Sequence, residues 1–576
     1  MPRCLPVLLL GSLVSAQVAP DLLRHVPDDA IAVVRTVGLG GWGKGLGATG
    51  VGRMFAAPSL HEPAAALLKG LLAEVGVESE SVDRLGELAV ELKEHRGEVV
   101  VAAVCDVASA TADSMPDFAV LFAVAGSDEE LTTIERALRE VLGEDGKERR
   151  IDGEAFVVHA LDDCEITAPW RHGGASFVFL GHGLDRTIPK FLRERSEPHP
   201  AAAELQQGVF AARVEVQPLV GLLRTIVDIA GEEAANVPVG PLVELIGLSA
   251  IERVGMSIRA DGEYFANEAH LEWRGAERGL FGVVLPARSE RPQILDLVPA
   301  GARNWNTGLI DAEAALRLYA RGFELFADVL PMSRQEIEHK FTELTKVRLV
   351  EDLLAHVGGE YLVVQDLAAV ADLETEMPEQ LEKLDERAGD SVFVLQLRDG
   401  AKLALNVEKA LRARGMHAGR KSEEYAGTKV YRLLLLGSMP IEYAFSGDVF
   451  VLGVGDGEAT KQNLRGVLDA VALRAKGQAK VDLRPEVLAK MKGWADGWAS
   501  IDVGSLEEIL DGVVGNFELA ATTLAEAEID DDVMPWVGPA LDLAKRMRIE
   551  ARRLGLDVAL SAVWTGRDRV VVRSRW

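Results

Sequence analysis

The chain contains two similar copies of one pattern, and this duplication limits the folds available to it more than any other feature. The segment from about Leu22 to Trp273 recurs, element by element, from about Leu295 to Trp576. Each copy opens with a Val-Pro pair just before an extended apolar run, where the fixed φ of proline suits the start of a strand. The sequence therefore predicts two related units in tandem.

The order of the expected elements favours an α+β fold. In each copy, strands come in consecutive pairs joined by tight turns, with helices placed singly or in pairs among them. That order predicts two tandem copies of a mainly antiparallel sheet with helices packed on one face. Strict alternation of strand and helix, which a parallel doubly wound sheet needs, is missing. We expect the repeats to span residues 17–288 and 289–576, divided near the stretch VLPARSERPQ.

The first 16 residues have the pattern of an export signal. Arg3 precedes a short apolar stretch from Leu5 to Leu13, and the small-x-small sequence Val14-Ser15-Ala16 follows it. Signal peptidase cuts after such a sequence, so Gln17 would begin the mature chain. No later segment approaches the roughly 20 apolar residues that a membrane span requires. We expect a periplasmic or secreted protein with no membrane span in the mature chain.

Composition restricts the classes of partner. A chain of 576 residues with 48% hydrophobic content can bury more than one core. The formal net charge of -28 argues against nucleic acid, because a phosphate backbone is bound through clustered lysine and arginine. Anionic lipid surfaces are disfavoured for the same reason. An unknown protein or a small-molecule ligand remains as the partner.

Two cysteines survive signal cleavage, and both belong to the first copy. Cys105 and Cys164 fall at or near the ends of expected strands. In an oxidising compartment they could form a disulfide, provided that their Cα atoms come within about 7 Å. Two separate buried thiols are the alternative.

A histidine and a glutamate recur at the same place in both copies. The pairs are His95 with Glu98 and His356 with Glu360, each where a helix ends and a strand begins. A His/Glu pair can act as general acid and base, so these four residues are candidate catalytic groups. In the structural alternative, the histidine serves the last helix carbonyls and the glutamate is solvated.

Metal-capable side chains gather over one short span of the first copy. His159, Asp162, Cys164 and His172 are of the residue types that hold zinc or another transition metal. Their spacing matches none of the compact ligand pairs of known zinc signatures. Surface or buried histidines beside turn aspartates are the alternative interpretation.

A glycine-rich stretch imitates a dinucleotide-binding fingerprint. Gly38, Gly40 and Gly43 have the required spacing after an expected strand. The run of glycines continues to Gly52 instead of opening a helix, and the surrounding order is not a βαβ unit. We therefore expect a flexible loop here and no cofactor.

The opening of the mature chain resembles a group of exported bacterial proteins of unknown function. The resemblance rests on the pattern L-x-x-V-P-x-D-A-x-A-V-V from Leu23 to Val34 and covers about the first 50 mature residues. The second copy departs from it at Ala300-Gly301 and at Trp305. The resemblance implies export and assigns no functional residue.

These observations favour an exported, non-catalytic protein that binds a ligand or partner or has a structural role in the envelope. Nucleophile motifs such as Gly-x-Ser-x-Gly and Ser-x-x-Lys are absent from the sequence. The alternative is an extracytoplasmic hydrolase with a site in the first repeat or in the crevice between repeats. A shallow apolar groove would favour binding, whereas a deep pocket with converging histidine and carboxylate groups would favour the enzyme.

Overall fold

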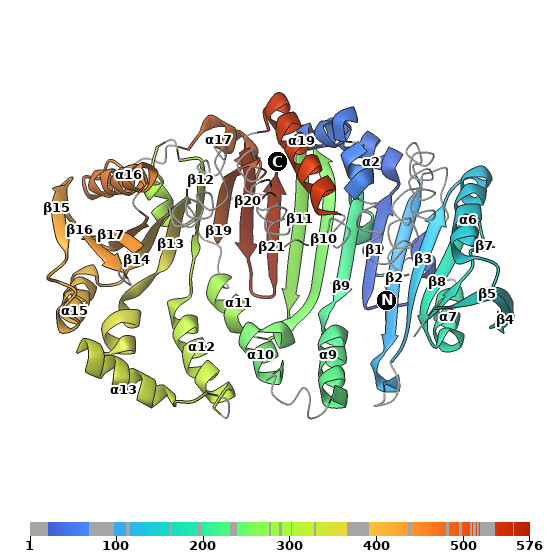
Figure 1. Cartoon of the computed structure of the whole chain (residues 1–576), viewed down its shortest axis with the longest axis horizontal. Helices are drawn as coiled ribbons and strands as arrows, with labels where there is room; N and C mark the ends of the chain where they lie inside the picture. Colours follow the sequence, from blue (N-terminus) through green and yellow to red (C-terminus); the bar gives the residue numbers. More distant parts are fainter. Residues whose placement is uncertain are drawn as a thin grey trace.

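A computed structural model of the chain contains one long, curved sheet with helices along both of its margins (Figure 1). The structure describes residues 21–576 except 61, 68–96, 111–115, 162–163, 194–198, 231–238, 276–277, 287–290, 301, 328–329, 366–390, 436–438, 456, 480–482, 495–497, 507–509, 511–513, 515–517, 519–535 and 557. Every ladder between described strands is antiparallel. The predicted α+β class with a mainly antiparallel sheet is confirmed.

In the part of the chain that the structure describes, the first half contributes eleven strands to the sheet. They are β1 (Ala32–Val37), β2 (Glu98–Asp106), β3 (Asp117–Ala125), β4 (Lys147–Ile151), β5 (Glu154–Leu161), β6 (Cys164–Thr167), β7 (Trp170–His172), β8 (Ala175–His182), β9 (Phe210–Glu215), β10 (Ile251–Asp261) and β11 (Tyr264–Trp273). Their spatial order is β4-β5-β6-β8-β3-β2-β1-β9-β10-β11, and β7 pairs with the start of β8.

The second half contributes the remaining described strands. They are β12 (Asn304–Leu309), β13 (Val357–Gln365), β14 (Ser391–Leu397), β15 (Lys421–Tyr425), β16 (Thr428–Leu435), β17 (Met439–Ser446), β18 (Val449–Val454), β19 (Ser500–Ser505), β20 (Val558–Thr565) and β21 (Arg569–Arg575). Their spatial order is β15-β16-β17-β18-β14-β13-β12-β19-β20-β21. Each strand of this order has a counterpart in the order of the first half.

The last strands of the two halves pair with each other. Residues Ala266 to Glu272 of β11 lie opposite Arg575 to Arg569 of β21 in one antiparallel ladder. The two halves therefore share a single open sheet, and their strand orders run outward from this ladder in the same sequence. A ladder of backbone hydrogen bonds joins the halves at the place where the sequence predicted a crevice.

Helices cover both faces of the sheet at its outer ends. We call the surface that carries Val100 and Leu362 face A, and the opposite surface face B. On face A, α7 (Leu184–Leu192) packs in the first core, and α16 (Glu458–Ala475) with α17 (Pro485–Met491) packs in the second. On face B lie α6 (Asp128–Leu142) in the first half and α15 (Gly400–Ala413) in the second. Helix packing at the ends thus extends to the second face as well.

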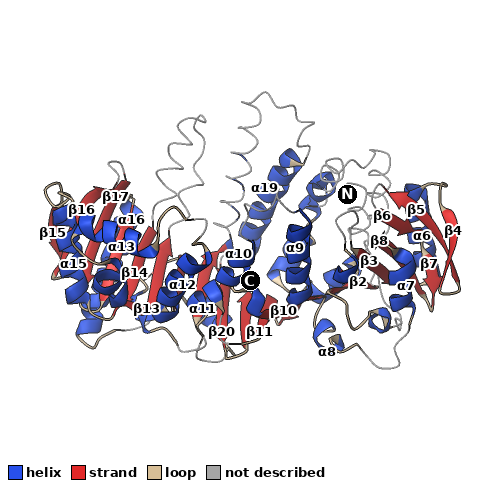
Figure 2. Ribbon diagram, turned by 90° about the horizontal axis from the view of Figure 1, so that it is seen from below, coloured by secondary structure: helices blue, strands red, loops and turns tan. Residues whose placement is uncertain are grey.

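Over the central strands, most described helices lie on face B. The group near one end of these strands is α9 (Val216–Ala230), α10 (Val239–Ile246), α11 (Gly279–Val284), α12 (Ala312–Leu325) and α13 (Arg334–Thr345). The group near the other end is α2 (Leu39–Leu46), α3 (Gly50–Phe55) and α19 (Val537–Leu554). Figure 2 shows α9, α10 and α19 on one side of the central strands. No described helix is both long enough and apolar enough to cross a membrane.

The glycine-rich stretch forms α2 and α3, so the expectation of a flexible loop is wrong. Close packing explains why glycine is needed. A Cβ atom at Gly45 would lie 2.4 Å from Val209 Cγ1, and one at Gly50 would lie 2.2 Å from Leu556 Cδ2. Thr49 caps α3, because its side chain accepts a hydrogen bond of 2.9 Å from the Gly52 amide. These glycines allow helices to approach their neighbours.

Candidate functional site

An apolar groove lies where the two halves of the chain meet. Its walls are α10 and α11, which end the first half, and α12, which begins the second. The cavity has a volume of about 460 Å³. Its lining consists of Leu245, Ile246, Leu280, Val283, Ala315, Leu318, Tyr319, Gly322, Phe323, Phe326 and Leu330. We call it the junction groove.

One stripe of α12 and the residues just after it supply most of the lining. Ala315, Leu318, Tyr319, Gly322, Phe323 and Phe326 recur at intervals of three and four residues, so they share one face of the helix. The stripe is legible in the sequence and is typical of a helix packed on a core. In this structure the stripe faces an open groove. Its spacing is the same as that of a helix face buried in a core, so the sequence alone does not identify it as a binding site.

Contacts at the start of α12 hold the groove walls together. The Asp311 side chain caps the helix by accepting a hydrogen bond of 2.8 Å from the Ala314 amide. The backbone amide of Asp311 donates to the carbonyl of Val283 in α11, at 2.9 Å. Phe281 of α11 packs with Trp273 on the sheet, with ring centroids 5.9 Å apart, whereas Leu280 and Val283 line the groove.

The groove offers hydrocarbon surface and one hydroxyl group. Among the described lining residues, Tyr319 alone has a polar side chain. Burial raises the pKa of Tyr319, and the nearby charge of Glu338 raises it further. The Arg334 guanidinium lies 5.5 Å from the centre of the tyrosine ring. A ligand with many polar groups would lose its hydrogen bonds to water here and gain few in return.

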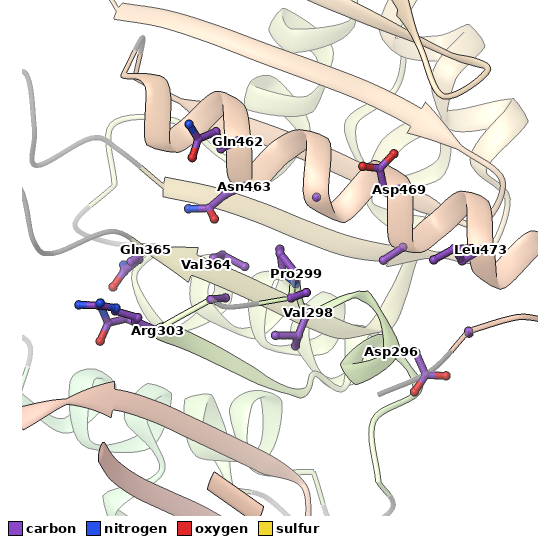
Figure 3. Close-up of a pocket in the computed structure, with 16 residues that line it drawn as sticks. Asp296, Val298, Pro299, Arg303, Val364, Gln365, Gln462, Asn463, Asp469 and Leu473 are labelled. Atoms are coloured by element: carbon purple, nitrogen blue, oxygen red, sulfur yellow. The ribbon is translucent and has the colours of Figure 1, made fainter. Parts of the chain in front are cut away.

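A second, more polar pocket lies beside α16 in the second half (Figure 3). Its volume is about 570 Å³, and its polar side chains include Arg303, Gln365, Gln462, Asn463 and Asp469. Most of these side chains are exposed, and Asp469 already accepts a hydrogen bond of 3.0 Å from the Tyr425 hydroxyl. The pocket is therefore a depression on the surface in which few polar groups are oriented to bind a ligand.

A polar cluster lies on face B of the second half, across β12, β13 and β19. Asn306 pairs with Asp502, and Gly308 lies between Ser500 and Tyr361. A Cβ atom at Gly308 would lie 2.9 Å from the Tyr361 hydroxyl, so the tyrosine ring lies directly over this glycine. Desolvation by burial raises the pKa of Asp502, and a hydrogen bond with Asn306 partly opposes that shift. Part of the Asp502 side chain is nonetheless exposed to solvent.

The candidate catalytic glutamates have structural partners. Glu98 Oε1 accepts a hydrogen bond of 2.8 Å from Arg35 Nε. Glu360 Oε2 accepts one of 2.7 Å from the backbone amide of Ile294. His356 is buried, and its Nε2 has no hydrogen-bond partner among the described residues. His95 lies outside the described residues. Acid-base catalysis by these groups therefore stays a prediction.

The residues of the predicted metal cluster are dispersed over separate strands. His159 is buried on β5, and burial lowers its pKa. His172, at the end of β7, stacks on Trp170 with a centroid distance of 5.0 Å. Cys164 begins β6, and Asp162 lies outside the described residues. Within the described part of the chain, no group of three or more histidine, cysteine or acidic residues could hold a metal ion.

The predicted disulfide between Cys105 and Cys164 is absent, and strand order explains why. Cys105 is half-buried on β2, and Cys164 is half-buried on β6. Strands β3 and β8 separate β2, which carries Cys105, from β6, which carries Cys164. Three interstrand spacings of about 4.8 Å put the two strands roughly 14 Å apart, well beyond the reach of a disulfide.

A buried histidine and glutamate on face A escaped the sequence analysis. His270 Nε2 of β11 lies 2.9 Å from Glu204 Oε1 of α8 (Ala202–Leu205). Burial by itself raises the pKa of Glu204, but the hydrogen bond with His270 and nearby positive charges outweigh it and lower the pKa. Gly255 makes room for the pair, because a Cβ atom there would lie 2.2 Å from the imidazole ring.

Comparison with known proteins assigns no family to this chain. No protein-family model matches it, and no curated protein matches it. Two solved structures of TP0453 are similar to part of the chain. Crystal form III has 10% identity and a TM-score of 0.24, covering 48% of this chain and 91% of TP0453. Crystal form I has 10% identity and a TM-score of 0.22, covering 46% and 81%. Scores this low carry no argument about function.

Proposed function

We propose that this protein is an exported, non-catalytic binding protein that holds the hydrocarbon chain of an amphiphile in the junction groove. The observation that carries the proposal is the lining, in which Tyr319 has the one polar side chain among the residues that the structure describes. Burial of each methylene group contributes about 0.8 kcal/mol, so a flexible chain gains affinity with length. The volume of about 460 Å³ lies within the range of small-molecule sites.

We also propose that the two halves, residues 17–288 and 289–576, descend from one duplicated unit. Their matching strand orders support this proposal, as do the corresponding Val-Pro pairs at Val26 and Val298. The groove belongs to neither half alone, since α10 and α11 come from the first and α12 from the second. On this proposal, duplication created the binding surface.

Titration with a fluorescent long-chain fatty acid tests the binding proposal. Replacement of Gly322 by leucine should weaken probe binding at least tenfold, because the new side chain would occupy the groove. A Cβ atom at Gly322 fits, since its nearest neighbour, Leu245 Cδ1, is 3.5 Å away. The matched control is Arg317→Leu, which adds the same side chain at an exposed position of α12 outside the lining.

Unchanged probe affinity in a folded Gly322→Leu protein would overturn the groove assignment. Equal loss of affinity in the Arg317→Leu control would also overturn the groove assignment.

A hydrolase would cleave an ester probe, so recovery of the intact ester after incubation with the protein would favour binding over the hydrolase alternative. The intact mass of protein taken from the periplasm or medium would show whether the chain begins at Gln17.

A further inference from the structure

Large apolar side chains are exposed on the row of helices that forms and borders the junction groove. Leu219 and Leu223 of α9, Leu242 of α10, Leu280 and Val284 of α11, and Leu330 after α12 are each between 38 and 48% exposed. We call these six residues the apolar strip. Two of them, Leu280 and Leu330, also line the groove, so the strip and the groove are continuous.

Helices α9, α10 and α11 expose leucine or valine on their outer sides and also bury apolar side chains on their inner sides. Val220 of α9 and Val243 of α10 are buried, and Phe281 of α11 packs on the sheet. The exposed leucines of α9 and α11 lie on the remaining surface of the same helices. Charged residues such as Arg224 and Glu244 lie on the same helices, so the exposed apolar side chains cover only part of each outer side. By contrast, α13 of this chain, with the sequence RQEIEHKFTELT, is mostly polar.

The four helices lie side by side along one margin of the sheet (Figure 1). Contacts join α9 to α10, α10 to α11 and α12, and α11 to α12. The six exposed side chains therefore belong to four helices that contact their neighbours. Clusters of exposed apolar side chains mark sites of association.

Charge identifies the kind of surface that the strip suits. Helices α9 to α12 carry three arginines against four acidic residues, whereas the whole chain has a formal net charge of -28. Arg321 Nη2 lies 3.1 Å from Glu244 Oε2, which neutralises part of this charge locally. A nearly neutral apolar surface on a strongly acidic protein is suited to an uncharged or zwitterionic surface and is repelled by an anionic one.

We infer that the apolar strip docks on the surface of a zwitterionic lipid bilayer, from which a hydrocarbon chain reaches the junction groove. This inference rests on the proposed function, because a bilayer is the source of the amphiphile that the groove would hold. The continuity of strip and groove gives the chain a path that stays out of water. Partial burial of Leu219 and Leu223 in the bilayer interface would supply part of the binding free energy.

Flotation with phosphatidylcholine vesicles tests the inference. The double variant Leu219→Ser with Leu223→Ser should reduce the vesicle-bound fraction at least fivefold. The matched control changes two leucines that are exposed on other helices, Leu405→Ser with Leu473→Ser, and should bind as the wild type does. Added phosphatidylglycerol should weaken binding at low salt.

Titration with a soluble fatty-acid probe in the absence of vesicles distinguishes the docking inference from the proposed function. If the wild-type protein binds the probe but not the vesicles, the docking inference alone is wrong. If the wild-type protein does not bind the probe, the proposed function is wrong. Sedimentation velocity supplies a further outcome. A wild-type dimer that the strip variants dissociate would show that the strip joins two copies of this chain, and the docking inference would be wrong.

Discussion

Single side chains distinguish the second half from the first at matching strand positions. Counting from the Val-Pro pairs and along the ladders, Asn306, Gly308 and Asp502 take the places of Val34, Thr36 and Ala212. Two of these changes, Val34 to Asn306 and Ala212 to Asp502, replace an apolar side chain with a polar one on the same backbone. Sequence comparison of the copies could have located this difference, because it needs only the register.

Replacement of Asp502 by asparagine should stabilise the protein at neutral pH. Desolvation raises the pKa of Asp502 in the folded state above its ordinary value of 3.8, so folding there favours the protonated carboxyl group. Wild-type stability should fall as pH rises from about 4 through the raised folded pKa. Asparagine does not ionise, so its stabilising effect should be present at pH 7 and absent below about pH 3.5.

Melting temperatures of both proteins from pH 3 to pH 8 check this prediction. The control is Asp542→Asn, at an exposed position of α19 next to Arg546. If Asp502→Asn destabilises the protein at pH 7, the carboxylate contributes favourable interactions that outweigh its desolvation.

Local signals in the sequence govern individual elements with little help from the rest of the molecule. Ser127 and Glu130 form a capping box at α6, in which the Ser127 amide donates to Glu130 Oε2 at 2.6 Å. The buried stripe of the same helix, Leu131, Ile134 and Leu138, follows the helical period onto face B. Both signals involve residues that are close together in the sequence. The start of this helix and its inner face can therefore be predicted from the sequence alone.

Loss of the Ser127 cap should lower the free energy of unfolding by a predictable amount. Ser127→Ala removes the side chain that accepts from the Glu130 amide, and the expected destabilisation is about 1 kcal/mol. Hydrogen exchange of the first turn of α6 should quicken accordingly, by about fivefold. Arg136→Ala, on the exposed side of α6, should change stability by less than about 0.5 kcal/mol. Equal effects of the two substitutions would contradict the assigned cap.

At the scale of the whole molecule, one ladder couples two separate cores. The first half has its own core around Phe177 and Phe179, and the second half has its own around Val451 and Leu468. Between them the central strands carry arginine and glutamate pairs on face A, such as Arg573 with Glu268 at 2.9 Å. The β11-β21 ladder is the most extensive connection between the two halves. An apolar cluster that joins α3 with α19, and the packing of α10 and α11 on α12, supplement it.

Proline in the middle of β21 should uncouple the halves. Val571 lies opposite His270 in the ladder, and proline there removes a backbone donor from a strand that is paired on both sides, where proline is not tolerated. Calorimetry should show one transition for the wild type and two for Val571→Pro. Val571→Ala keeps the backbone amide and should keep the single transition. Two transitions in the wild type would mean that the ladder does not couple the cores.

The sequence by itself determined the α+β class, the antiparallel character of the sheet and the matching order of strands. These properties depend on periodicity, turn residues and proline positions, which act over a few neighbouring residues. Only the tertiary structure decided that β11 and β21 pair, that two strands separate Cys105 from Cys164, and that α10, α11 and α12 enclose a groove. Each of these depends on which strand edges and helix faces meet across long stretches of chain. A pattern can mark a face as apolar, but only packing decides whether that face is buried in a core or left open to a ligand.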